Sequence, residues 1–219
     1  MIFATNGSMG NHVMIKEEKE TKELIQVALG NAQNYSEYIT MVRELAATNG
    51  TTGPAQTEAL INYTQLNNRR MKRWDKTLKI PTEVESQFEG LDRKITWLVL
   101  TESWCGDASP SLPVMNKLAE LSPNLDLKIV LRDEHLELTD RFLTNGARSI
   151  PKLIVLDTET QTVLGEWGPR SAKATQMVMD EKAKHGSLSA EFKEALQVFY
   201  NKDKGQDIVR DLAELLTLK

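Results

Sequence analysis

The chain has 219 residues, of which 40% are hydrophobic and 26% are charged, a composition typical of globular proteins. Its formal net charge of −4 gives no general attraction to nucleic acid or to anionic membranes. No apolar run is long enough to span a bilayer, since the best of them, Ile95 to Leu100, is short and interrupted by Thr96. Neither a nucleic-acid partner nor a membrane partner is therefore expected.

Cys105 is the single cysteine of the sequence. An internal disulfide is impossible, and nothing indicates an oxidising compartment, so the cytoplasm is the expected location. Residues 1–14 lack the basic start and the apolar stretch of a secretory signal. They are expected to be a loose segment or a non-native remnant.

Helical periodicity dominates residues 15–90. Apolar residues recur at helical spacing from Lys16 to Ala47, and the break near Gly30 predicts two helices there. A third helix is predicted from Gln56 to Lys76, ended by Ile80-Pro81. We expect this helical N-terminal portion to pack on the rest of the chain.

The end of the third predicted helix and the residues just after it carry a dense group of basic residues: Arg69, Arg70, Lys72, Arg73, Lys76 and Lys79. Such a group can bind an anionic partner or a nucleic-acid backbone. The favoured interpretation is a solvated helix face, opposite a face that packs inward through Tyr63, Leu66, Met71 and Trp74.

Strands and helices alternate after Gly90. The predicted strands are Ile95–Thr101, Asp126–Leu131, Lys152–Leu156 and Thr162–Trp167; the predicted helices are Ser109–Leu121, Leu136–Leu143, Ala172–Lys184, Ser189–Tyr200 and Asp207–Leu218. The first two strands are joined through a helix and should be parallel, with a right-handed crossover. The last two are joined too closely for a crossover and should form an antiparallel hairpin. Residues 91–219 are thus predicted to form an α/β domain, a mixed sheet flanked by helices with a helical C-terminal tail.

The segment Trp104-Cys105-Gly106-Asp107-Ala108 lies between the first predicted strand and the helix after it. Backbone N–H groups and the helix dipole favour a thiolate at this position, by roughly 0.3–1 kcal/mol for an exposed site. A carboxylate about 6 Å away costs the thiolate from ~0.7 to ~3 kcal/mol, depending on the dielectric constant. We therefore predict a partly exposed Cys105 thiol of near-normal acidity. The alternative is that Cys105 is a small buried apolar residue.

This segment resembles the active loop of the thioredoxin superfamily, Trp-Cys-Gly-Pro-Cys, which occupies the same strand-to-helix turn. Ser149-Ile150-Pro151, before the third predicted strand, is similar to the cis-proline segment of that superfamily. From about residue 56 to 219, the chain is similar to bacterial thioredoxin-family proteins with extra N-terminal helices and a Cys-Gly-Asp loop. The resemblance implies a thioredoxin-like fold with a cis peptide bond before Pro151.

The departures from the superfamily pattern limit the chemistry. Asp107 stands in place of the loop proline and Ala108 in place of the second cysteine, so dithiol exchange within one chain cannot occur. The resemblance implies that Cys105 is the reactive residue. It also implies a substrate groove formed by Trp104, Gly106, Asp107, Ala108, Ile150 and Pro151.

Arg170 follows the turn after the last predicted strand and is a candidate anion site or modulator of the Cys105 pKa, although a surface ion pair is its favoured role. The three histidines, His12, His135 and His185, show no metal-ligand spacing, and one cysteine cannot hold zinc alone. No metal and no cofactor are expected.

Two functions remain open. In the first, Cys105 is the nucleophile of a monothiol thiol-disulfide oxidoreductase that serves cell redox homeostasis, and an external thiol, from a small molecule or a protein, resolves its mixed disulfide. In the second, the chain is a non-catalytic thioredoxin-fold module that binds a peptide or protein in the cis-proline groove. The oligomeric state is left open.

Two related enzyme classes are disfavoured. A peroxiredoxin would have threonine three residues before its cysteine, where this chain has Glu102. A monothiol glutaredoxin would have a glycine pair after the fourth strand, whereas Gly165 and Gly168 are separated here.

Overall fold

The computed structural model of the protein describes residues 6–216, and side chains from residue 17 onward. Its elements are α1 (Asn6–Gly30), α2 (Tyr35–Ala47), α3 (Glu58–Thr77), α4 (Thr82–Glu89), β1 (Ile95–Thr101), α5 (Ala108–Ala119), β2 (Leu125–Leu131), η1 (Arg132–Glu134), α6 (Leu136–Arg141), β3 (Lys152–Asp157), β4 (Val163–Trp167), α7 (Ala172–His185), α8 (Ala190–Asp203) and α9 (Gln206–Leu215). Among the residues described, no helix combines the length and the apolar character needed to cross a membrane.

The sheet has four strands in the order β2-β1-β3-β4. β1 pairs with β2 in parallel, from Ile95 opposite Leu125 to Thr101 opposite Leu131. β3 is antiparallel to both β1 and β4. The pairing predicted for the first two strands and for the final hairpin is confirmed.

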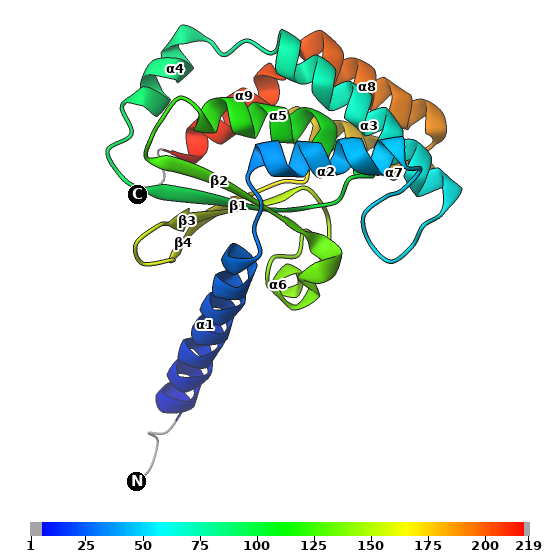
Figure 1. Ribbon diagram of the computed structural model, residues 1–219. Helices are drawn as coiled ribbons and strands as arrows, with labels where there is room; N and C mark the ends of the chain where they lie inside the picture. Colours follow the sequence, from blue (N-terminus) through cyan, green and yellow to red (C-terminus); the bar gives the residue numbers. More distant parts are fainter. Residues whose placement is uncertain (1–5, 217–219) are drawn as a thin grey trace.

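Two apolar cores lie on opposite faces of the sheet. The larger packs α2, α3, α4, α5, α7, α8 and α9 against one face, through residues such as Trp97, Leu112 and Met115. The smaller packs α1 and α6 against the other, around Ile25 and Leu98. Figure 1 shows this asymmetry: most helices form a layer over one face of the sheet, whereas α1 extends away from the other. Every residue of β1 is buried, as expected for a strand covered on both faces.

Local sequence sets the start of several helices. Asn34 caps α2 by accepting the N–H of Glu37, whose side chain accepts the N–H of Asn34 in return. Thr57 and Ser189 cap α3 and α8 through their hydroxyl groups. These caps supply partners for N–H groups that have none within the helix.

The α/β fold class predicted from the sequence is confirmed, and most predicted bounds differ from the observed ones by one or two residues. Larger differences lie at the N-terminus and after Pro81. α1 begins at Asn6 and not at Lys16, so part of the segment expected to be loose is helical. α4 was not predicted: α3 ends at Thr77, and Pro81 is the N-cap residue of α4, whose first turn contains Glu83 and Glu85. α9 ends at Leu215, and the predicted end at Leu218 lies outside the described residues.

Candidate functional site at Cys105

Cys105 lies in the turn between β1 and the N-terminus of α5, and only 5% of its surface is exposed. Its Sγ donates a hydrogen bond to the carbonyl oxygen of Ile150 at 3.2 Å. The Ile150–Pro151 peptide bond is cis. The prediction of a partly exposed thiol was wrong, because the segment before β3 lies directly against the sulfur.

Burial is the main cause that raises the pKa of the Cys105 thiol to about 12, and the Asp107 carboxylate raises it further. Hydrogen bonds from the backbone N–H groups of Ala108 and Asp107, together with the charge of Arg170, act in the opposite direction. Near-normal acidity was predicted from the helix dipole and Asp107 alone. That prediction was wrong because it left out desolvation, and the sulfur is a protonated thiol at neutral pH.

The Asp107 carboxylate has two partners from the C-terminal half of the chain. Arg170 Nη2 lies 2.7 Å from Asp107 Oδ2, and the Tyr200 hydroxyl donates to Asp107 Oδ1 at 3.1 Å. Burial raises the pKa of Asp107, and Arg170 and Tyr200 oppose that rise. Burial, with the charge of Asp107, also raises the pKa of Tyr200, so its hydroxyl remains a donor at neutral pH.

The ion pair of Arg170 is not the surface pair that was favoured from the sequence. The side chain of Arg170 is 22% exposed and that of its partner Asp107 is 12% exposed. The alternative role, proximity to the cysteine loop, is the one that the geometry supports. We therefore describe Asp107, Arg170 and Tyr200 together as the Asp107 group.

Gly168 fixes the loop that carries Arg170. Its φ is +111°, and a Cβ atom at this position would lie 2.1 Å from the carbonyl oxygen of Pro151. Only glycine permits so close an approach together with this backbone conformation. The loop after β4 therefore packs on the Pro151 segment, which brings Arg170 to Asp107.

Ser103 anchors the start of the cysteine loop through buried hydrogen bonds. Its hydroxyl lies 2.8 Å from that of Thr64 in α3 and accepts the N–H of Thr52 at 3.0 Å. Its carbonyl oxygen accepts a hydrogen bond from Asn67 Nδ2, also at 3.0 Å. These contacts fix α3 and the loop before it beside Cys105.

A cavity of about 730 Å³ lies over Cys105 and is called here the Cys105 cavity. Its volume is in the range of small-molecule sites. The ionisable residues that line it, besides Cys105 and Tyr63, are Arg70, Arg132, Arg148, Arg170, Lys193, Asp107 and Glu194. Apolar residues, among them Leu60, Leu188 and Leu196, complete the wall.

The structure brings most of the predicted groove residues together. Those that line the cavity with Cys105 are Trp104, Gly106, Asp107 and Ile150, whereas Ala108 and Pro151 are not among the lining residues. The Arg132 guanidinium lies over the Trp104 ring, 5.1 Å from its centroid. The functional roles assigned to these residues stay predictions.

Four other residues near the cysteine loop were not predicted as site residues. Tyr200, Lys193 and Gln197 come from α8, and Arg70 comes from α3. A Cβ atom on Gly106 would lie 3.9 Å from Gln197 Nε2 and 4.0 Å from Arg70 Nη1, so both side chains reach the loop. Arg70 belongs to the basic group of α3, but the sequence gave no sign that its side chain turns toward the cysteine loop. The sequence of α8 contained no motif that would mark its residues as part of a site.

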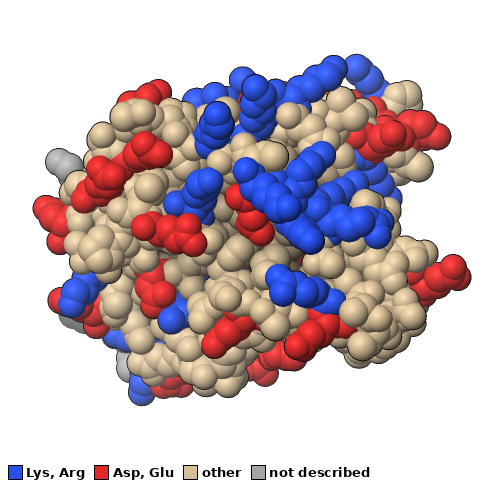
Figure 2. All heavy atoms as spheres, turned by 45° about the horizontal axis from the view of Figure 1, so that its top comes forward, with Lys and Arg blue, Asp and Glu red and all other residues tan. Residues whose placement is uncertain are grey.

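The remaining basic residues of α3 and its C-terminal extension form a solvated face, as the sequence favoured. Arg69, Lys72, Arg73, Lys76 and Lys79 are exposed, and Figure 2 shows lysine and arginine side chains gathered over the layer of helices. On the opposite side Met71 and Trp74 are buried. Tyr63 is an exception, since 41% of its surface is exposed at the Cys105 cavity.

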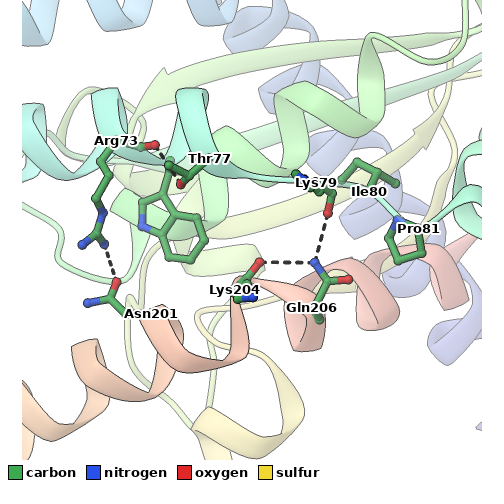
Figure 3. A pocket seen from close by; sticks show the side chains of 9 residues that line it. Arg73, Thr77, Lys79, Ile80, Pro81, Asn201, Lys204 and Gln206 are labelled. Atoms are coloured by element: carbon green, nitrogen blue, oxygen red, sulfur yellow. Dashed lines mark hydrogen bonds between the residues drawn. The ribbon is translucent and has the colours of Figure 1, made fainter.

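A second cavity, of about 550 Å³, lies where the end of α3 meets the junction of α8 and α9. Figure 3 shows its polar groups paired with one another: Arg73 donates to Asn201, and Gln206 Nε2 donates to the Lys79 and Lys204 carbonyl oxygens. Within the described part of the chain, no cluster of three or more His, Cys, Asp or Glu residues is placed to hold a metal ion.

The mixed sheet, the helices on both its faces and the cysteine at the start of the helix after β1 define a protein of the thioredoxin-like α/β class. The sequence model of a family described as Thioredoxin matches residues 53–184, and the chain belongs to that family.

Two solved structures share the fold. A protein of unknown function from Pseudomonas aeruginosa, PA1234, aligns with a TM-score of 0.58 at 18% identity, over 87% of this chain and 95% of that one. An HIV epitope-scaffold aligns with a TM-score of 0.52 at 18% identity, over 84% of this chain and 98% of that one. At these identities the likeness concerns the fold alone. No curated protein matches the chain in sequence.

Proposed function

We propose that this thioredoxin-family chain is a monothiol thiol-disulfide oxidoreductase. The observation that carries the proposal is that Cys105, at the N-terminus of α5, lines a cavity of small-molecule size while Ala108 stands where a second cysteine would resolve its adduct. We further propose that the chain is related to the bacterial family members with a Cys-Gly-Asp loop. We also propose a cytoplasmic location for the protein, because a single cysteine gives no sign of an oxidising compartment.

The reaction proceeds by two exchanges. The Cys105 thiolate attacks one sulfur of a disulfide, RS–SR. A new bond forms between the Cys105 sulfur and the attacked sulfur, and the original S–S bond breaks. The other half of the disulfide leaves as the thiolate RS⁻ and takes up a proton. A second thiol, R′SH, loses its proton and attacks the SR sulfur of the adduct. The products are R′S–SR and the restored Cys105 thiol, so the reduction of one half of RS–SR is balanced by oxidation of R′SH.

A different observation favours the second candidate, a binding module without thiol chemistry. Burial raises the pKa of Cys105 to about 12, and its Sγ is engaged with the Ile150 carbonyl oxygen at 3.2 Å. A thiol of this kind presents little thiolate at neutral pH. The two candidates therefore differ in whether the folded chain reacts with a disulfide at all.

The test uses a neutral probe, 2-hydroxyethyl disulfide, at pH 8 with the intact mass of the full chain as readout. Because the sequence has one cysteine, any thiol adduct reports Cys105. The oxidoreductase predicts an adduct on the folded chain that a second small thiol removes, and no adduct on Cys105→Ser. If the chain reacts in urea but not when folded, the proposal fails and the binding module is favoured.

A further inference from the structure

The cationic residues of the Cys105 cavity differ in how they are paired. Arg170 pairs with Asp107, Arg132 with the adjacent Asp133 at 2.7 Å, and Arg148 with Asp140 through two hydrogen bonds of 2.6 and 2.7 Å. Among the side chains of residues 17–216, neither Arg70 nor Lys193 has an acidic partner within salt-bridge distance. The remaining acid of the lining, Glu194, likewise has no salt bridge to either of them.

Arg70 is half-buried despite the absence of a carboxylate partner. Its one described side-chain hydrogen bond runs from Nη1 to the Asn67 amide oxygen at 3.3 Å. Burial is the main cause that lowers the pKa of Arg70, and the charge of Arg73 lowers it further, whereas Tyr63 and the Asp107 carboxylate act in the opposite direction without cancelling the effect. A guanidinium held in such a place gains most from an anion that satisfies its unused donors.

The position of Arg70 relates it to the sulfur. Its Nη1 would lie 4.0 Å from a Cβ atom on Gly106, the residue after Cys105. Lys193 contributes a second positive charge from α8, and the apolar side chains of Leu60 and Leu188 and the ring of Tyr63 line the same cavity. The wall therefore offers cations for an acidic group and apolar surface for a short carbon skeleton.

We propose that the substrate of Cys105 is a low-molecular-weight disulfide or thiol that carries carboxylate or phosphate groups, bound through Arg70 and Lys193. This inference rests on the proposed function and names its substrate class. A cavity of about 730 Å³ lies in the size range of small-molecule sites. The positive charge of Arg70 also offsets the repulsion between an anionic substrate and the thiolate that must form beside it.

The first test measures binding without thiol chemistry. The probe is 3,3′-thiodipropionate, a dicarboxylate whose thioether cannot exchange, titrated into the full chain by calorimetry at low salt. We expect saturable binding that weakens with added sodium chloride and weakens about tenfold in Arg70→Gln and in Lys193→Gln. Arg69→Gln is the matched control, since Arg69 is exposed on the same helix and does not line the cavity; it should bind as the unchanged chain does.

The outcomes separate the two proposals. Absence of binding, or equal affinity in Arg70→Gln, Lys193→Gln and Arg69→Gln, overturns the substrate class, even if the neutral disulfide still forms an adduct on Cys105. Binding of an acidic peptide in place of the dicarboxylate also overturns it, in favour of a protein substrate. Binding of the dicarboxylate with no adduct from any disulfide supports the anion site and rejects the exchange reaction.

Discussion

The Asp107 group and the Arg70–Lys193 pair line one cavity but differ in how their charges are satisfied. In the Asp107 group, a buried carboxylate has a guanidinium and a hydroxyl as partners, supplied by the loop after β4 and by α8. Arg70 and Lys193, which line the same cavity, make no salt bridge with an acidic side chain among residues 17–216. The paired charges of the Asp107 group hold the loop after β4 against the cysteine loop, whereas the charges of Arg70 and Lys193 are the ones that we propose for a ligand.

The first prediction concerns the acidity of Cys105. Because burial raises its pKa to about 12, the thiolate fraction of the folded chain grows about tenfold per pH unit below that value. The rate of adduct formation with 2-hydroxyethyl disulfide should therefore rise about a thousandfold from pH 7 to pH 10. The chain unfolded in urea is the reference and should level off near pH 9. If the rate for the folded chain reached a plateau below pH 9, burial of Cys105 would not suppress its thiolate.

The second prediction concerns the loop that positions Arg170. Gly168→Ala places a methyl group against the Pro151 carbonyl oxygen at a positive φ, and we expect a loss of about 3 kcal/mol or more in the free energy of unfolding by urea. Gly186→Ala is the matched control, with a φ of +73° and no atom within 4 Å of the new methyl group. It should cost about 1 kcal/mol. Equal losses in the two variants would contradict the close packing of the loop.

The third prediction separates the two acids of the cavity. Next to burial, Asp107 is the main cause of the raised pKa of Cys105. Asp107→Asn should lower that pKa and speed adduct formation at pH 8 about tenfold. Glu194→Gln removes the exposed acid of the cavity wall and should change the rate less than twofold. A rate unchanged by Asp107→Asn would favour the binding module.

The smallest effect is expected from the hydroxyl of Tyr200. Tyr200→Phe removes its hydrogen bond to Asp107 and should lower the free energy of unfolding by about 1 kcal/mol. Tyr63→Phe is the control, because Tyr63 is 41% exposed on the wall of the same cavity; it should change stability by less than about 0.5 kcal/mol. If both variants are neutral, the buried hydroxyl does not hold Asp107.

The sequence was sufficient for much of the fold and for part of the site. Apolar periodicity located all four strands, and the Trp104–Ala108 and Ser149–Pro151 segments located the two loops that meet at the sulfur. The acidity of Cys105 was missed because desolvation depends on the segment that folds over it. Arg70 and Tyr200 were missed for a related reason: α3 and α8 bring them to the cavity by tertiary packing, and no local pattern distinguishes them from their neighbours.

A competition between two disulfides asks whether Cys105 reacts inside a cavity that is selective for anions. The full chain at pH 8 is exposed to equal concentrations of an anionic disulfide, 3,3′-dithiodipropionate, and a cationic one, cystamine, and the adduct masses are compared with those of the urea-unfolded chain. We expect folding to shift the ratio toward the anionic adduct and Arg70→Gln to reverse most of that shift. An unshifted ratio, or no adduct on the folded chain, would contradict that expectation.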